Sequence, residues 1–357
     1  MSVMTSHTLA FTDEAARDVS QTGGKGAGLA EMTGAGLPVA PGFVVTASAY
    51  HDFLDANDLR TEIAELLASG ADVTTIEAHM SERLASTTFP AAIEEQVRVQ
   101  YAALCDQVGL ANVPVAVRSS ATAEDSAGNS FAGEFETWVD VAGADSVVEH
   151  VLRCYASVFT GRVLDYAIER GIDLADVEMA VVVQKTVRAR AAGVMFTLDP
   201  ISGDRSRIVL EASWGLGLAV VGGEVNPDRY VVAKVGMAIV EQIAGDKHLE
   251  YRDGHGTTEV APERRTQLCL TDEEVLALAT LGKQIEKHNG CPQDIEFAVD
   301  EDLPKGANII LLQCRPETVW GAVQRKPVFD SGAGVMSWIT GTISGATSTP
   351  KDRHSHG

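Results

Sequence analysis

The sequence lacks any apolar run long enough to span a bilayer, which takes about 18 residues or more, and its N-terminus has no basic segment leading into an apolar one. We therefore expect neither a membrane span nor an export signal. Its five cysteines are odd in number and widely spaced, and they include no C-x-x-C pair. A disulfide framework is not expected, and a reducing cytoplasm fits this pattern best.

Positive charge is scarce as well. Lys and Arg number 28 against 50 Asp and Glu, which gives a formal net charge of -22. Nucleic acids and anionic lipids are bound mainly by clustered cations, so neither is expected as a partner. If the ligand is a polyphosphate, the few cations must gather in one cleft and be helped by a divalent metal.

The composition is that of a soluble globular protein, with 45% hydrophobic and 22% charged residues. A chain of 357 residues can form one large or two medium domains, and a bilobal protein is the default expectation.

The pattern of the chain changes near residue 113. Before it, residues 15–37 predict a Gly-rich loop that opens a helix, residues 42–46 a strand, and residues 47–108 a helical insertion. After it, short β-branched runs bounded by Gly, Asp and Ser predict an antiparallel or mixed sheet, with a helix over residues 146–170. The expected fold class is α+β.

The C-terminal third predicts a helix that ends at Gly290 and two strands, residues 294–299 and 308–313. After Pro316 the sequence becomes rich in Gly, Ser and Thr, which predicts a tail or linker.

The first motif is the run GGKGAG, which places Lys25 among glycines at a helix start. Exposed backbone N–H groups and the helix dipole favour an anion there. The run does not match the Walker A pattern, and a plain turn is the structural alternative.

The second motif is VRSSATAED, in which Arg118 is expected at the end of an apolar strand, facing a hydroxyl-rich turn. A guanidinium in this position can hold phosphate oxygens in a bidentate manner. Alternatively, Arg118 pairs with Glu124 or Asp125 while the hydroxyls cap a helix.

Two further segments suit a nucleotide. The run from Phe131 to Thr137, with Gly133 inside it, can close over a triphosphate with backbone amides, or can be a simple hairpin. Gln184 and Lys185 end an apolar strand at a position suited to hydrogen bonds with adenine, unless this is an edge strand with solvated ends.

The two late strands end in polar groups. Glu296 and Gln313 offer oxygen ligands of the kind that Mg²⁺ prefers, and Arg315 would lie beside the same phosphates. Taken singly, these residues also fit a solvated strand edge. Cys314 has no histidine near it in sequence and no elbow-like turn, so a core thiol is favoured over a nucleophile. The histidines of the tail, His354 and His356, are expected to be exposed terminal residues.

The order of these motifs resolves the alternatives. GGKGAGL, VRSSATAEDSAGNSFAGEFET, VVVQKTV, AGVMFTLDP, EASWGLGLAVVGGEVNPDRY, DIEFA and LLQCRP follow one another along residues 15–318. Together they resemble the N-terminal ATP-binding domain of the pyruvate, phosphate dikinase and phosphoenolpyruvate synthase family, which has an ATP-grasp-type fold and is shared with rifampin phosphotransferases.

The resemblance implies a bilobal fold with ATP in the cleft between the lobes. The N-terminal lobe would comprise residues 1–186, with the helical insertion at about 47–108, the C-terminal lobe residues 187–320, and a flexible tail residues 321–357. Lys25, Arg118 and Arg315 would act in catalysis, and Glu296 and Gln313 would hold Mg²⁺. The implied ATP contacts are Lys25, Arg118, Gly133, Thr137, Gln184, Glu296, Gln313 and Arg315.

The family transfers the β-phosphoryl group of ATP to a histidine on a mobile domain, giving AMP and phosphate. The family's phosphohistidine motif, a Thr followed by Gly-Gly and then a His, does not occur in this sequence. The chain therefore resembles the smaller subunit of phenylphosphate synthases and related cresol-phosphorylating enzymes. We expect a separate phosphohistidine-domain subunit as partner and a small acceptor, such as a phenolic hydroxyl, bound on that partner. The alternatives are a detached nucleotide-binding domain of a phosphoenolpyruvate synthase or rifampin phosphotransferase-like enzyme, and a non-catalytic regulatory module.

Overall fold

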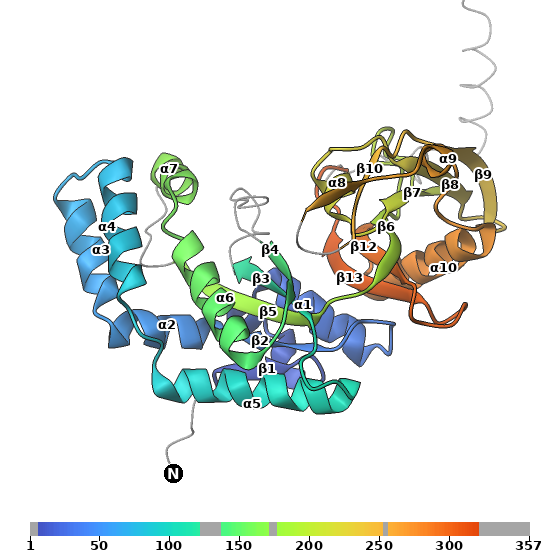
Figure 1. Ribbon diagram of the computed structural model, residues 1–357. Helices are drawn as coiled ribbons and strands as arrows, with labels where there is room; N and C mark the ends of the chain where they lie inside the picture. The colour runs from blue at the N-terminus through green and yellow to red at the C-terminus, as the bar shows by residue number, and fades with distance from the viewer. Residues whose placement is uncertain (1–5, 122–136, 171–176, 253–255, 321–357) are drawn as a thin grey trace, which may run out of the picture. The chain divides into compact units, whose positions relative to one another are not determined.

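The first sheet of this computed structural model has the strand order β1-β2-β5-β3-β4 (Figure 1). The structure describes residues 6–121, 137–170, 177–252 and 256–320. Neighbouring strands pair antiparallel. The strands are β1 (Thr8–Ala10), β2 (Gly42–Val45), β5 (Met179–Lys185), β3 (Val115–Ala121) and β4 (Thr137–Val141).

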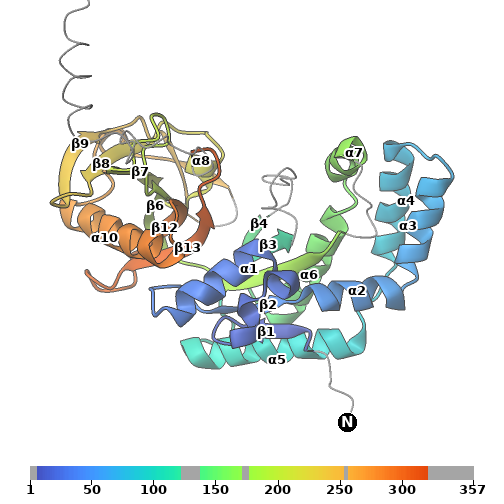
Figure 2. The same cartoon turned by 180° about the vertical axis from the view of Figure 1, so that it is seen from behind.

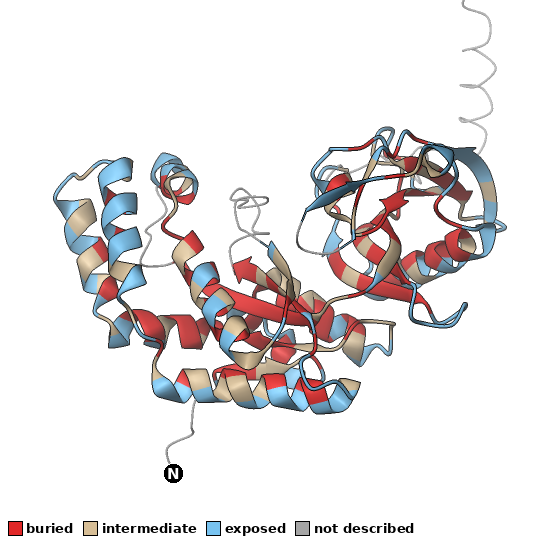
Figure 3. Ribbon diagram, in the orientation of Figure 1, coloured by how far each residue is buried: buried red, intermediate tan, exposed pale blue. Residues whose placement is uncertain are grey.

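The short strands after residue 113 were expected to form one antiparallel or mixed sheet, but they belong to two large sheets, and β5 is the central strand of the first. It lies between β2 and β3, and its apolar residues are buried throughout (Figure 3). Val181 and Val183 pack against the helical part of the molecule, whereas Ala180 and Val182 belong to a second core. This alternation is the period of two that a strand dictates, and a central strand has both faces covered.

The residues expected to be helical, 47–108, contain α2 (Ala47–Ala56), α3 (Leu59–Ala68), α4 (Val73–Ala85) and α5 (Ala91–Val108). Helix α5 runs along β1 and β2 (Figure 1, Figure 2). The single helix expected over residues 146–170 is two helices, α6 (Ala144–Ser157) and α7 (Gly161–Arg170), because the chain turns between them. A short 3₁₀ turn, Glu14–Arg17, precedes α1 (Val19–Gly34).

The second sheet has the strand order β13-β12-β6-β7-β8-β9, again with antiparallel neighbours. Helix α10 (Asp272–Asn289) packs on this sheet. It begins with a capping box, in which Thr271 and Glu274 satisfy each other's backbone N–H groups, and it ends at Gly290 with a φ of 71°. The strands are β6 (Ala189–Phe196), β7 (Arg207–Trp214), β8 (Asp228–Ala233), β9 (Ala238–Ile243), β12 (Gln293–Asp300) and β13 (Ile309–Pro316).

The remaining elements lie between β7 and α10 in sequence. They are α8 (Leu218–Val221), the hairpin of β10 (Leu249–Tyr251) and β11 (Thr257–Glu259), and α9 (Pro262–Arg265). Within the described residues, no helix is long and apolar enough to cross a bilayer.

Both sheets belong to one compact unit, residues 1–317. The division of the chain into lobes at residue 186 stays a prediction. The predicted tail, residues 321–357, lies outside the described residues.

Candidate functional site

The last two strands, β12 and β13, bring four polar side chains to one face of the second sheet. In the antiparallel pair of β12 and β13, Glu296 lies opposite Gln313 and Asp294 opposite Arg315. Residues directly opposite in antiparallel strands have adjacent side chains. The sequence-predicted residues Glu296, Gln313 and Arg315 are therefore neighbours in space.

A β-bulge makes this arrangement possible. Glu296 pairs with Gln313 but the next residue, Phe297, pairs with Leu311, so Leu312 is one extra residue in β13. Leu311 is buried in the second core, while Leu312 and Gln313 both line a cavity on the other face. Bulges often redirect a side chain beside a functional site, and this one could not be predicted from the apolar run of LLQCRP.

Asp294 is a site residue that the sequence analysis missed. Its Oδ2 lies 3.6 Å from Nε of Arg315, and its Oδ1 is buried without a hydrogen-bond partner among the described residues. Burial raises the pKa of Asp294 to about 6, although Arg315 acts to lower it. Its position two residues before Glu296 on the same strand was the available signal, because such residues share a face.

Lys25 approaches the cavity from α1. The Gly-rich run lies inside this helix, but the helix breaks at Gly23, where φ is 66° and ψ is 172°, and a regular turn starts again after it. A Cβ at Gly23 would lie 2.1 Å from the carbonyl oxygen of Ser120, so only glycine fits this close approach to β3. Nζ of Lys25 donates to the carbonyl oxygen of Ser119 at 3.2 Å.

Arg118 lies within β3, which continues to Ala121, and not at the end of a strand as expected. Its guanidinium donates to Glu296 at 3.2 Å and so joins the first sheet to the second. The alternative partners, Glu124 and Asp125, lie outside the described residues.

Gln184 lies at the end of the central strand β5, so the edge-strand alternative was wrong. Its side chain is 2% exposed, and its Nε2 donates to the carbonyl oxygen of Ala40 at 3.2 Å. That bond fixes the amide and leaves Oε1 as an acceptor. Thr137 begins β4 directly opposite Arg118. Gly133 lies outside the described residues.

These side chains surround one cavity of about 340 Å³, a volume within the range of small-molecule sites. All seven described residues of the predicted set line it: Lys25, Arg118, Thr137, Gln184, Glu296, Gln313 and Arg315. The described lining carries one carboxylate, Glu296, and four cationic side chains. The cations are Lys25, Arg118, Lys185 and Arg315. Apolar side chains form much of the remaining wall, among them Val187, Leu216, Leu218, Val221 and Leu312.

The donor set suits a magnesium ion that is held partly by its ligand. In the described part of the chain, no group of three or more His, Cys, Asp or Glu side chains could hold a metal by itself. Mg²⁺ is usually bound by one or two carboxylates together with substrate phosphates and water. Glu296 and Gln313, with Asp294 close by, fit this pattern.

Cys314 faces away from this chemistry. It is buried in the second core, and its Sγ donates to Oε1 of Gln293 at 3.1 Å. Burial raises the pKa of this thiol to about 12, so it stays protonated at neutral pH. This agrees with the expected core thiol. The tail histidines lie outside the described residues.

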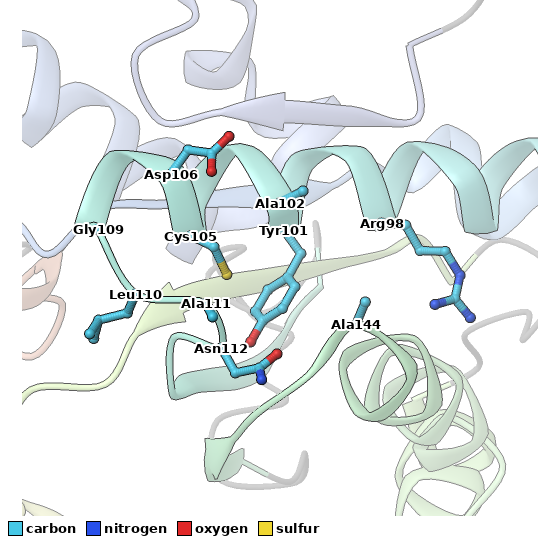
Figure 4. A pocket seen from close by; sticks show the side chains of 10 residues that line it. All are labelled: Arg98, Tyr101, Ala102, Cys105, Asp106, Gly109, Leu110, Ala111, Asn112 and Ala144. Atoms are coloured by element: carbon cyan, nitrogen blue, oxygen red, sulfur yellow. The ribbon is translucent and has the colours of Figure 1, made fainter.

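A second pocket opens beside the C-terminal end of α5 (Figure 4). The hydroxyl of Tyr101 lies there, but it donates to the carbonyl oxygen of Val113 and accepts from the N–H of Gly143. Arg98 is paired with Glu94 and Asp145. None of the predicted site residues lines this pocket.

A mixed α+β fold with a cavity lined by cations, a carboxylate and amide oxygens fits a nucleotide-binding domain. The sequence matches the family described as pyruvate phosphate dikinase, AMP/ATP-binding domain, over residues 19–332. The chain belongs to this family.

Relatives along most of the chain carry the name phosphoenolpyruvate synthase. The protein of Methanothermobacter thermautotrophicus, named "Probable phosphoenolpyruvate synthase", is 41% identical over 322 residues, which cover 88% of this chain and 46% of that protein. Phosphoenolpyruvate synthase of Pyrococcus furiosus is 38% identical over 355 residues, covering 86% of this chain and 43% of that protein. The chain thus spans less than half the length of these two relatives.

A solved structure, D-alanyl-alanine synthetase A from Vibrio cholerae, aligns with a TM-score of 0.27 and 11% identity over 66% of this chain and 49% of that one. A likeness this low supports no inference.

Proposed function

We propose that the cavity binds Mg²⁺·ATP and that the chain catalyses the ATP-dependent half of a dikinase-type phosphotransfer. The observation that carries this proposal is the charge of the cavity: among the described residues, four cations and one carboxylate line its wall, in a protein with a net charge of -22. A cationic pocket in an acidic protein attracts a polyphosphate locally. The nucleotide would lie between the two sheets, in the manner of an ATP-grasp fold.

Each part of the cavity has a role in this proposal. Lys25, Arg118 and Arg315 would neutralise the phosphate oxygens, and phosphoryl transfer depends mainly on such positioning and charge stabilisation. Glu296 and Gln313 would hold the metal, which would add positive charge at the phosphates. Oε1 of Gln184 is free to accept a hydrogen bond from the 6-amino group of adenine, and the apolar wall suits the flat base.

The acceptor of the phosphoryl group is proposed to be a histidine on a separate protein. The β-phosphoryl group of ATP would form a bond to that histidine as AMP leaves, and the γ-phosphoryl group would pass to water as phosphate. The phosphohistidine would then phosphorylate a small acceptor on the partner, and a phenolic hydroxyl is the chemistry that the sequence resemblance implies.

A second candidate is the nucleotide-binding part of a phosphoenolpyruvate synthase. The names of the relatives and the identity along more than four-fifths of the chain favour it. Both candidates use the same cavity and the same nucleotide chemistry, and they differ only in the final acceptor.

The experiment is a transfer assay with ATP labelled in the β- or the γ-phosphoryl group, using a phosphohistidine-domain protein purified from the same cells. We expect acid-labile label on that protein from β-labelled ATP alone, together with AMP. ADP as the sole nucleotide product would overturn the dikinase mechanism. Pyruvate and phenol are then added in parallel assays. Transfer of the label to phenol supports the first candidate, and transfer to pyruvate supports the second.

A further inference from the structure

One apolar wall of the nucleotide cavity is a short segment that follows β7. Leu216, Gly217, Leu218 and Val221 all line the cavity, and the last two begin and end α8. A helix of four residues has little stability by itself, so contacts with the rest of the protein must fix its position.

Strand β10 holds the start of this segment. The N–H of Leu216 donates to the carbonyl oxygen of Tyr251 at 2.7 Å, and Gly215 forms a bridge with the same residue. Gly215 has a φ of 73°, and a Cβ there would lie 2.3 Å from the carbonyl oxygen of Tyr251. The close approach of the two backbones therefore requires glycine.

The side chain of Tyr251 holds the other end. Its hydroxyl donates to the carboxylate of Glu224, at 3.0 and 3.1 Å from the two oxygens. Glu224 follows α8, and its own N–H donates to the carbonyl oxygen of Ala219. Tyr251 thus contacts the chain on both sides of α8, by its backbone before the helix and by its side chain after it.

Strand β10 is itself anchored by a buried ion pair. Lys247, just before the strand, contacts Asp228 at the start of β8, and both side chains are 0% exposed. Asp228 also accepts from the N–H groups of Gly245 and Cys269 and from the hydroxyl of Tyr230. A buried ion pair often adds nothing to stability compared with apolar residues of the same size, but its geometry ties the chain just before β10 to the start of β8.

We propose that Lys247 and Tyr251 are positioning residues for nucleotide binding: Lys247 fixes β10, and β10 holds α8 against the base of the bound nucleotide. Neither residue lines the cavity. This inference rests on the proposed function, because it assumes that the cavity binds a nucleotide.

The test compares two ligands on the same protein. ATP would contact both the cations and the apolar wall, whereas Mg²⁺·tripolyphosphate would contact only the cations. In Lys247→Met, Asp228 stays buried with its three other donors but without its counter-charge, so we expect β10 to loosen and the protein to lose stability, and folding is checked by circular dichroism before binding is measured. We expect affinity for Mg²⁺·ATP to fall about tenfold, since small misplacements of binding groups have effects of this order or larger. Affinity for tripolyphosphate should stay within about twofold.

The matched control is Lys234→Met, which removes a lysine from another ion pair of the second sheet, with Glu286, away from the cavity. It should leave both affinities unchanged.

Tyr251→Phe removes only the hydroxyl and should weaken ATP binding about threefold, the effect of losing one modest hydrogen bond. If Lys247→Met does not fold, the affinities of Tyr251→Phe for the two ligands decide whether the inference holds.

A folded Lys247→Met or Tyr251→Phe protein with unchanged ATP affinity would overturn the inference, as would an equal loss for both ligands. If the unmodified chain binds neither ligand, it is the proposed function that fails.

Discussion

At the scale of single residues, the contact between Arg118 and Glu296 is the most informative. It joins β3 to β12 across 178 positions of sequence, and both side chains are partly exposed to the cavity. Without a ligand these two groups neutralise each other. In the proposed complex with Mg²⁺·ATP, phosphate oxygens would replace Glu296 as the partner of Arg118, which would free the carboxylate for the metal.

Replacement of Arg118 by alanine should weaken ATP binding by about tenfold or more, because a hydrogen bond to a charged group contributes about 1.5–3 kcal/mol. Titration calorimetry of the isolated chain with Mg²⁺·ATP measures this. Arg188→Ala is the matched control, since Arg188 pairs with Glu301 and Asp302 and does not line the cavity. Equal ATP affinities for the two variants would show that Arg118 does not contribute to ATP binding.

Cys314 provides a prediction about pH. Burial raises the pKa of Cys314 from 9.0 to about 12. Below pH 12 the fraction of thiolate is therefore smaller than for an exposed cysteine, and the rate of alkylation should increase as the pH rises. At pH 8 we expect iodoacetamide to label it about a thousandfold more slowly in the native protein than in urea. Peptide mapping after timed labelling gives both rates. Comparable rates in the two states would show that Cys314 is an accessible, reactive thiol.

At the scale of elements, the break in α1 connects the sequence to the site. Gly23 allows the helix to stop against β3 and start again, and the hydroxyl of Ser120 bridges the break by donating to the carbonyl oxygen of Thr22 and accepting from the N–H of Gly26. Lys25 is placed in the turn that follows. The break therefore sets the position of a predicted ATP contact.

Gly23→Ala should lower the free energy of unfolding by about 3 kcal/mol or more, because the backbone conformation is nearly restricted to glycine and the added Cβ meets a backbone oxygen. Gly36→Ala is the control: Gly36 has a similar φ of 71°, but its Cβ would meet nothing within 4 Å. It should lower stability by only about 1–2 kcal/mol. Urea unfolding of both variants gives the comparison, and equal losses would refute the role of the close approach to Ser120.

Local patterns were sufficient to predict most helices and strands. Gly290 at the end of α10 and the continuous apolar run of β5 are signals carried by neighbouring residues. They could not predict that β5 joins β2 and β3, because strand pairing depends on contacts between distant segments. The bulge at Leu312 and the pairing of Asp294 with Arg315 were missed for the same reason.

At the scale of the whole molecule, charge is the dominant property. The chain has a net charge of -22, so a highly anionic nucleotide approaches a protein of the same sign, and the cavity cations act over a short range in salt. Binding should therefore depend strongly on a divalent cation that reduces the charge of the nucleotide.

Removal of Mg²⁺ with a chelator should weaken ATP binding by about tenfold or more, the size of effect expected when a charge-neutralising ligand is lost from a partly desolvated site. Calorimetry with and without the chelator measures the change, and Glu296→Gln should reduce the difference. An affinity that does not depend on the metal would contradict the assignment of Glu296 and Gln313 as its ligands.

The most direct test of the central claim is a crystal structure of this chain with Mg²⁺ and a non-hydrolysable ATP analogue. We expect the phosphates among Lys25, Arg118 and Arg315, the metal on Glu296 and Gln313, and the base near Gln184. A nucleotide bound elsewhere, for example in the pocket beside α5, with the cavity between the two sheets empty, would contradict the account.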